Sequence, residues 1–425
     1  MKVVIITLGC KVNLYESEAI AKALTDKGVV VTNVLEKADA YVINTCAVTN
    51  EAESKSREYI AKINKIEPHA KIFVCGCSVQ NDNKKFLDKE NVVCAFGTAN
   101  KIALAELIIK TYDHQIEGKI ISNNIATKYE DNMLSLCMRT RGTIKIQDGC
   151  NSFCSYCIIP YVRGRSRSRS IMSIKNEINL LSKVTSEIVI AGVNLTEYGK
   201  DLSPKQSLSS VVLLFKDLNV RFRLGSLEAG IITEDFLKTL KTLPNFCDQF
   251  HLSMQSGSTE TLSKMNRHYT AEEFACQVAL IRKYFPQAGI TTDLIVGFPT
   301  EDDRQAEETY NLCKQLQFSD MHIFKYSKRS GTVASKMTNV AKNVPERVKS
   351  ITKLAKTMKI AFLEKNIDRE DEVLLEKIDD EFGYGYSKNY IECIVPKNEN
   401  MKHADIIKVK MIKVVSEKML TQPVI

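Results

Sequence analysis

Short apolar runs alternate with helical patterns along the first part of the chain. Residues 2–8, 41–45 and 71–75 are rich in valine and isoleucine and are predicted to form strands. Residues 17–27 and 52–65 carry apolar side chains every three to four positions and are predicted to form helices. Strand–helix–strand alternation predicts a parallel sheet with helices on its faces.

A second alternating series follows a polar, weakly periodic stretch at residues 115–141. Six apolar runs predict strands at 143–147, 187–191, 221–226, 249–254, 289–296 and 321–326. The clearest helices between them are predicted at 174–182, 234–243, 271–285 and 302–317. About six β/α units predict a partial barrel related to the eight-stranded form, with reactive groups at the carboxyl ends of its strands.

The pattern changes again near the end of the chain. A long basic helix is predicted at 345–365, followed by strands at 372–378, 390–395 and 406–415. Turns are predicted at Gly383, Gly385 and residues 396–398. These elements predict a small β-barrel of OB-like size, a common nucleic-acid-binding scaffold.

Four regions are therefore expected: an N-terminal α/β domain (1–114), a linker (115–136), the partial barrel (137–365) and the small β-barrel (366–425). The hydrophobic content of 44% is typical of soluble globular proteins. No apolar run approaches the ~18 residues that a membrane span needs, so we expect a cytoplasmic protein without a membrane partner. The net charge of +8 permits a polyanionic partner, and the lysines of residues 388–418 are candidates for phosphate contacts.

Three cysteines stand together directly after the first predicted barrel strand: Cys150, Cys154 and Cys157. Three thiolates can hold a four-iron cubane cluster at three corners, which leaves one iron open to a ligand. A closed electron-transfer cluster would need a fourth cysteine nearby, and the next is Cys247. A disulfide framework is not expected with 13 cysteines and no predicted signal peptide, and zinc usually brings a second ligand pair. The spacing predicts an open iron–sulfur cluster.

Cysteines also end three predicted strands of the N-terminal domain: Cys10, Cys46, and Cys75 with Cys77. Because the carboxyl ends of parallel strands lie along one edge, these residues can converge on a second three-thiol site. The alternative for any one of them is a small buried hydrophobe, the common fate of a free cysteine.

The cysteine loop after the first strand of a six-unit barrel resembles that of the radical S-adenosylmethionine (SAM) enzymes. Residues 9–13 (Gly-Cys-Lys-Val-Asn), 43–46 and 76–77 resemble the methylthiotransferases, and so do residues 157–164, 255–258 and 293–299. The C-terminal barrel resembles their RNA-binding TRAM module. The implied fold is α/β, with an N-terminal parallel α/β domain, a central partial (β/α)6 radical SAM barrel and a C-terminal TRAM-like β-barrel.

The resemblance implies two [4Fe–4S] clusters and SAM as cofactors. Cys150, Cys154 and Cys157 would hold the SAM-binding cluster, and Cys10, Cys46 and Cys77 the auxiliary one. Cys75 has no place in the usual pattern, so Cys77 is favoured as the ligand. Thr300 and the region of Ala404 also depart from the family, which usually has glycine there.

Residues 9–13 and 44–49 resemble the branch that acts on N6-threonylcarbamoyladenosine at position 37 of the tRNA anticodon loop. This implies sulfur insertion at C2 of the adenine, methylation by a second SAM, an external electron donor and a sulfur donor. The alternatives are a methylthiotransferase for isopentenyladenosine-37 or for a ribosomal protein, and, in another class, a noncatalytic iron–sulfur RNA-binding protein.

The residues expected to contact SAM are Tyr156, Arg163, Gln255, Ser256 and Asp293, with Arg163 at the SAM carboxylate. Arg165, Arg167 and Arg169 follow at alternate positions, either as phosphate ligands or as a solvated basic loop. His251 alternates with apolar neighbours along a predicted strand, and we expect a hydrogen-bonded core residue.

Overall fold

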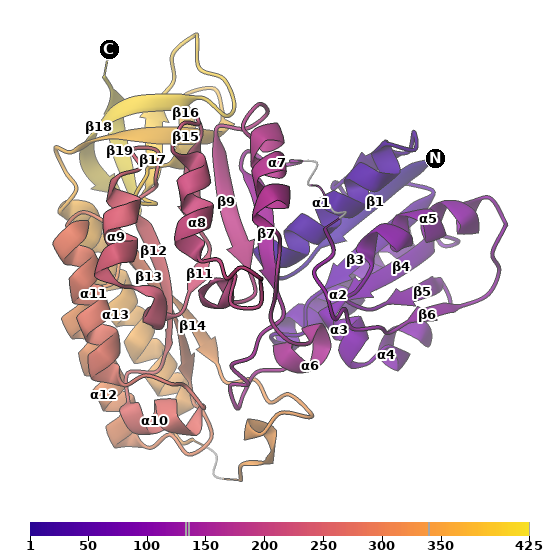
Figure 1. Ribbon diagram of the computed structural model, residues 1–425, viewed down its shortest axis with the longest axis horizontal. Helices are drawn as coiled ribbons and strands as arrows, with labels where there is room; N and C mark the ends of the chain where they lie inside the picture. The colour runs from indigo at the N-terminus through magenta and orange to yellow at the C-terminus, as the bar shows by residue number, and fades with distance from the viewer. Residues whose placement is uncertain (132–133, 135–136, 339–340, 425) are drawn as a thin grey trace.

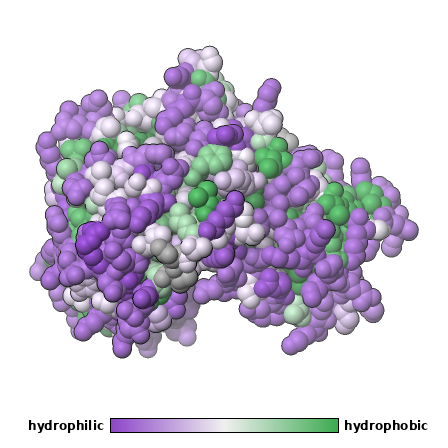
Figure 2. Space-filling view, turned by 90° about the horizontal axis from the view of Figure 1, so that it is seen from below, coloured by the Kyte–Doolittle hydropathy of each residue, from purple (hydrophilic) through white to green (hydrophobic). Residues whose placement is uncertain are grey.

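The computed structural model describes residues 1–131, 134, 137–338 and 341–424. Figure 1 shows three parts: an N-terminal α/β domain on the right, a larger central barrel on the left, and a small β-barrel (yellow) above the central one. Within the described residues, none of the helices is long and apolar enough to cross a membrane. The face drawn in Figure 2 is largely hydrophilic, with its apolar residues in separate patches.

The N-terminal domain is built on a six-stranded, entirely parallel sheet. Across the sheet the strands are β2 (Val30–Thr32), β1 (Lys2–Thr7), β3 (Ala40–Thr45), β4 (Lys71–Gly76), β5 (Val92–Phe96) and β6 (Ile120–Ser122). One face is covered by α1 (Lys11–Thr25) and α5 (Lys101–Tyr112). The other is covered by α2 (Asn50–Ile66), α3 (Cys77–Asn81) and α4 (Lys84–Leu87). Because both faces are buried, the strands are continuously apolar.

The three predicted strands of this domain are confirmed, but the pattern missed three others. β6 lies inside the predicted linker, so its three residues belong to the sheet. Helix α1 begins at Lys11, six residues before the predicted start. Its first apolar residues, Val12 and Leu14, are two positions apart, a spacing that does not mark a helix, so apolar periodicity alone did not reveal this turn.

The central region contains the six predicted parallel strands in chain order. They form two sheets, β10-β9-β7-β8 and β11-β12-β13-β14. The strands are β7 (Gly142–Asp148), β8 (Arg167–Ser168), β9 (Glu187–Gly192), β10 (Arg221–Leu224), β11 (Ser226–Leu227), β12 (Gln249–Gln255), β13 (Gly289–Val296) and β14 (Asp320–Lys325). Gly225 divides the third predicted strand into β10 and β11, and β8 adds a short antiparallel pair with β7.

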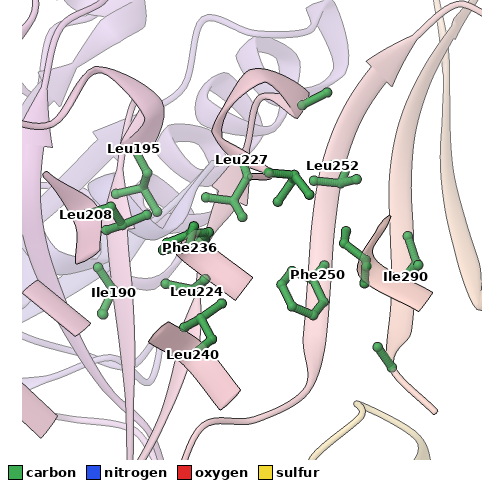
Figure 3. Packing of buried hydrophobic residues seen from close by; sticks show 14 of the residues in the cluster. Ile190, Leu195, Leu208, Leu224, Leu227, Phe236, Leu240, Phe250, Leu252 and Ile290 are labelled. Atoms are coloured by element: carbon green, nitrogen blue, oxygen red, sulfur yellow. The ribbon is translucent and has the colours of Figure 1, made fainter. Parts of the chain in front are cut away.

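Helices follow and connect these strands, and most of them pack on the outside and close the core. They are α6 (Ile159–Arg163), α7 (Ile171–Leu181), α8 (Leu208–Val212), α9 (Glu234–Lys241), α10 (Thr259–Lys264), α11 (Ala271–Tyr284), α12 (Asp303–Leu316) and α13 (Val344–Glu364). Figure 3 shows Leu224 of β10 beside Phe236 and Leu240 of α9, all within one buried cluster. On β12, Phe250 and Leu252 belong to that cluster, so His251, which lies between them, points to the opposite side, toward the barrel interior.

The C-terminal part is a closed five-stranded barrel in the order β15-β16-β17-β19-β18, as the TRAM-like prediction requires. Its strands are β15 (Glu370–Ile378), β16 (Phe382–Tyr386), β17 (Glu392–Pro396), β18 (Ile406–Val415) and β19 (Lys418–Pro423). The predicted turn at Gly383 and Gly385 is wrong, because both residues lie within β16. A Cβ on Gly385 would stand 1.9 Å from the Leu374 carbonyl oxygen, so close strand packing explains this glycine.

Candidate functional site

Three cysteines of the N-terminal domain follow three neighbouring strands. Cys10 caps α1 after β1, Cys46 follows β3, and Cys77 begins α3 after β4. Gly9 has a φ of +98°, and a Cβ there would lie 2.7 Å from the Cβ of Cys46. Only glycine allows this approach, which places the Cys10 loop directly against Cys46.

The thiols of these cysteines act on one another electrostatically. Burial, with smaller contributions from Cys77 and Cys10, raises the pKa of Cys46 to about 12. Burial likewise raises the pKa of Cys77, with a contribution from Cys10. Several thiolates cannot gather here unless positive charge accompanies them, and that is the environment a thiolate-ligated metal centre provides.

Cys75 has different surroundings from Cys77. It is fully buried in the apolar cluster beneath α1 and α5, together with Phe73 and Cys94. Cys77 instead packs with Ala47 and with residues of the barrel's α6 segment. The structure therefore groups Cys77, and not Cys75, with Cys10 and Cys46.

The second group of thiols lies on the loop between β7 and α6. Cys154 and Cys150 both raise the pKa of Cys157, after burial as the main cause. The backbone N–H of Ser152 donates to Cys150 Sγ at 3.4 Å, and Asn194 Nδ2 lies 3.9 Å from the same sulfur. All three predicted members of this group are thus brought together.

Arg267 is a neighbour of this loop that the sequence did not reveal. Its Nη1 donates to Cys154 Sγ at 3.4 Å and to Glu228 Oε1 at 2.9 Å. Its Nη2 donates to the Ser253 carbonyl oxygen at 3.1 Å. A fixed cation beside Cys154 favours the thiolate form, which is the form that binds metals.

Arg163 lies between the two thiol groups. Its Nε donates to Cys77 Sγ at 3.2 Å, and its Nη1 donates to Glu16 at 2.7 Å and to Asp148 at 3.0 Å. Nη2 donates to Asn13 at 2.8 Å, and the residue is 1% exposed. The guanidinium is fully used by these partners, so the expected contact with the SAM carboxylate would require it to give up one of them.

The three arginines that follow Arg163 differ from one another in their exposure. Arg167 and Arg169 are buried in ion pairs with Asp148 and Glu177. Only Arg165 is exposed, with its guanidinium 4.4 Å from the centre of the Phe153 ring. The alternating arginines are therefore mainly structural, and Arg165 alone keeps an exposed cation.

A cavity of about 750 Å³ opens beside Cys10 and Cys46, between all three parts of the molecule. From the barrel it is lined by inward-facing residues of adjacent strands, which include Gln249, His251, Thr291, Asp293, Asp320 and His322. It also reaches Gly192 at the end of β9, two residues before Asn194. Tyr386 and Tyr390 line it from the C-terminal barrel.

One polar layer of the barrel dominates the cavity wall. Asp293 accepts from His251 Nε2 and His322 Nδ1, each at 3.1 Å. Burial alone would raise the pKa of Asp293, but the two histidine hydrogen bonds outweigh it and hold that pKa well below its usual range. His251 is hydrogen-bonded and buried as expected, with Nδ1 2.9 Å from Thr291 Oγ1. The sequence did not lead us to predict His322, although the alternation of side chains along β14 places it on the inward face.

Comparisons with known proteins agree with this architecture. Residues 2–97 match the family described as Uncharacterized protein family UPF0004, and residues 144–313 match the Radical SAM superfamily. The threonylcarbamoyladenosine tRNA methylthiotransferase MtaB of Bacillus subtilis is 34% identical, over 96% of this chain and 93% of that protein. A tRNA-2-methylthio-N(6)-dimethylallyladenosine synthase of Clostridium novyi is 35% identical, over 87% of this chain and 84% of that protein.

The chain belongs to the radical SAM methylthiotransferase family. It is an enzyme of that family. The chain shares its fold with the solved radical SAM methyltransferase TsrM from Kitasatospora setae, with a TM-score of 0.56 and 14% sequence identity. The match covers 79% of this chain and 77% of the TsrM chain.

A radical SAM methylthiotransferase uses SAM and two [4Fe–4S] clusters, and the donor sets of this chain fit them. Each site offers three thiols brought together by the fold, and each has an arginine donating to one of its sulfurs: Arg163 to Cys77 and Arg267 to Cys154. Thiolate ligands suit iron–sulfur clusters, and a nearby cation compensates for their charge.

The other residues expected at SAM have varied surroundings. Asp293 lines the cavity, as described above. Ser256 Oγ instead pairs with Thr309 Oγ1 at 3.2 Å and accepts from the backbone of Ser258, so it organises the turn after β12. Tyr156 packs against an apolar cluster that includes Met265 and Phe298. Gln255 stands at the end of β12 with a φ of +68°.

Proposed function

We propose that this enzyme is a cytoplasmic tRNA methylthiotransferase that inserts sulfur at C2 of N6-threonylcarbamoyladenosine-37 and methylates it with SAM. The observation that carries the proposal is the cavity of about 750 Å³ that joins Cys10 and Cys46 to the barrel interior and to the C-terminal barrel. It gives a base a chamber beside Cys10 and Cys46 that reaches Gly192, two residues before Asn194, whose side chain lies next to Cys150 Sγ. The relatives from Bacillus subtilis and Thermotoga maritima, the latter 37% identical over 87% of this chain, carry the corresponding name.

Each thiol group has a proposed role. Cys150, Cys154 and Cys157 are to hold the cluster that binds SAM, and Cys10, Cys46 and Cys77 the auxiliary cluster. With SAM bound, the first cluster supplies the radical chemistry that an inert aromatic C–H bond requires. The protein's own part is to exclude water and to keep both sites at fixed positions, which the buried Arg163 contacts support. An external electron donor and a sulfur donor complete the reaction.

The tRNA is proposed to present base 37 to this chamber from the anticodon loop. Bases in such loops can leave the stack and enter a protein pocket at low cost. Tyr386 and Tyr390, whose rings stack 4.6 Å apart, line the cavity from the TRAM-like barrel. Aromatic faces of this kind suit an unstacked base. Among the lysines of this barrel, Lys410 and Lys418 pair with Asp368 and Glu392, so the phosphate contacts are proposed for the others.

Anticodon stem-loops offered to the reconstituted, reduced enzyme test the proposal. One carries threonylcarbamoyladenosine and the other dimethylallyladenosine, because relatives named for the second base are just as similar to this chain. Nucleoside mass spectrometry should find the methylthio product on the first stem-loop, together with 5′-deoxyadenosine from SAM. Product on the dimethylallyl stem-loop alone would refute the base assignment. Cys150→Ala is the control and should abolish both readouts.

A further inference from the structure

Lys11 is a cation beside the thiol group of Cys10, Cys46 and Cys77, and its own ammonium group is unpaired. It follows Cys10 in the first turn of α1, is exposed, and lines the cavity. Among the residues that the structure describes, none gives its ammonium group a hydrogen bond or an ion pair. An ammonium held at the wall of a partly enclosed chamber is positioned for an anionic ligand.

The carboxylates that line the cavity cannot serve Lys11, because each already has a cationic or histidine partner. Asp293 is held by His251 and His322, and Asp320 lies 3.1 Å from Lys359. The two glutamates of the C-terminal barrel that reach the cavity are also paired, Glu392 with Lys418 and Glu417 with Lys356. All four of these carboxylates are therefore engaged, and the Lys11 ammonium is left without a carboxylate partner in the cavity.

The surroundings of Lys11 add further positive charge. Arg223 and Arg141 both act on it electrostatically, opposed by Glu187 and, more weakly, by Cys10. These two arginines share Glu187 with Arg221, at 2.7, 3.1 and 2.6 Å respectively. The one additional carboxylate in this group, Glu376, pairs with Arg141. Three guanidinium groups against two carboxylates leave a net positive field beside Lys11.

We infer that Lys11 binds a carboxylate on the substrate base and thereby selects the acidic base over the apolar one. The inference rests on the proposed function and deepens it. A ligand group that reaches Lys11 also lies beside the Cys10 thiol. It must therefore belong to the base that receives sulfur, and not to the phosphates of the tRNA backbone. Threonylcarbamoyladenosine carries a free carboxylate, whereas dimethylallyladenosine carries no charge. An unpaired cation favours the first and gains nothing from the second.

The test compares two stem-loops that differ only in charge: threonylcarbamoyladenosine-37 and its carboxyl methyl ester. Affinity is measured by fluorescence anisotropy on the cluster-loaded enzyme without reductant, and methylthio product is measured separately. The wild type should prefer the acid by about tenfold or more, as a charge-assisted hydrogen bond implies. Lys11→Met should reduce this preference to about one, and Lys11→Arg should restore most of it. Lys175→Met, at an exposed position of α7 outside the cavity, should keep it.

The acid-to-ester ratio separates recognition from damage to the nearby cluster, because a damaged site weakens both stem-loops alike. A Lys11→Met enzyme that keeps the wild-type preference would overturn the inference. So would a wild-type enzyme that binds acid and ester equally while it forms product on both. A wild-type enzyme that acts only on the dimethylallyl stem-loop would instead refute the proposed function, so the two failures are distinguishable.

Discussion

Residues of one type have different environments at neighbouring positions of this chain. Cys75 lies in the apolar core and Cys77 lies beside Arg163, although they are only two positions apart. The sequence predicted both thiol groups, because regular spacing and strand ends are local signals. It could not predict that Arg163 is used by Glu16, Asn13 and Cys77, because those contacts depend on how two domains meet.

The first residue-level prediction uses this pair of cysteines. Cys77→Ala should remove roughly half of the iron from the reconstituted enzyme, because one of two four-iron clusters loses a ligand. It should leave SAM cleavage at the other cluster intact. Cys75→Ala should keep the full iron content and at most lower stability through a small cavity. Iron analysis and 5′-deoxyadenosine yield check both, and iron loss in Cys75→Ala would show that the ligand was misassigned.

The second residue-level prediction concerns two left-handed residues. Thr300 has a φ of +76° and Ala404 a φ of +68°, at or near the positions where glycine was expected. Strain of this kind costs of order 1 kcal/mol or more, and it is greater for a β-branched residue. Thr300→Gly should therefore raise the free energy of unfolding by ~1 kcal/mol in urea titrations. Thr300→Ala keeps the Cβ and should raise the free energy of unfolding by less. An equal gain would show that the cost lies in the threonine side chain beyond Cβ and not in the left-handed backbone.

Elements were predictable wherever one period ran without interruption. The central strands alternate between core residues such as Phe250 and cavity residues such as His251, and they were found nearly to the residue. The prediction of elements failed where the residue type is set by close packing and not by the period of a strand or helix. Gly385 is small because β15 passes close to it, and composition alone suggested a turn. The edge strand β6 is too short for its period to be recognised.

Adjacent strands also give a pH-dependent prediction. The hydrogen bond to Asp293 raises the pKa of His322 above its unfolded value. The stabilisation is therefore full below the unfolded pKa of about 6.5 and is lost as the pH rises through the folded value. His322→Asn should lower the unfolding free energy more at about pH 6 than at about pH 9. His69→Asn, at an exposed position, should show no such difference. An equal loss at both pH values would contradict the ion pair.

At the scale of the whole molecule, charged contacts join the parts. Arg163 links α1 of the N-terminal domain to β7 of the barrel through Glu16 and Asp148. Arg329, after β14, pairs with Glu53 of α2 at 3.0 Å. On the other side, Arg223 donates to the carbonyl oxygen of Lys388 at 2.9 Å, which ties the barrel to the C-terminal part.

Arg163→Met should weaken the whole assembly. Removing one member of a buried ion-pair group leaves its charges unbalanced, here two carboxylates, Glu16 and Asp148, that keep only Lys145 and Arg167 as partners, at a cost of about 3 kcal/mol. Hydrogen exchange should accelerate in α1 and α6, and the urea midpoint should fall. Arg163→Lys should recover only part, since a lysine cannot reach several acceptors at once. Arg165→Met, at the exposed neighbour, should cost no more than about 1 kcal/mol.

The cavity has a consequence for how such a protein can evolve. Its walls come from the Cys10 and Cys46 loops, from the barrel strands and from Tyr386 and Tyr390, so no single part of the molecule forms it alone. A recombination that replaced one part with that of a distant relative would keep three stable folds and lose the matched walls between them. Changes of substrate are therefore expected to accumulate as paired substitutions across the seams, with each part retained in place.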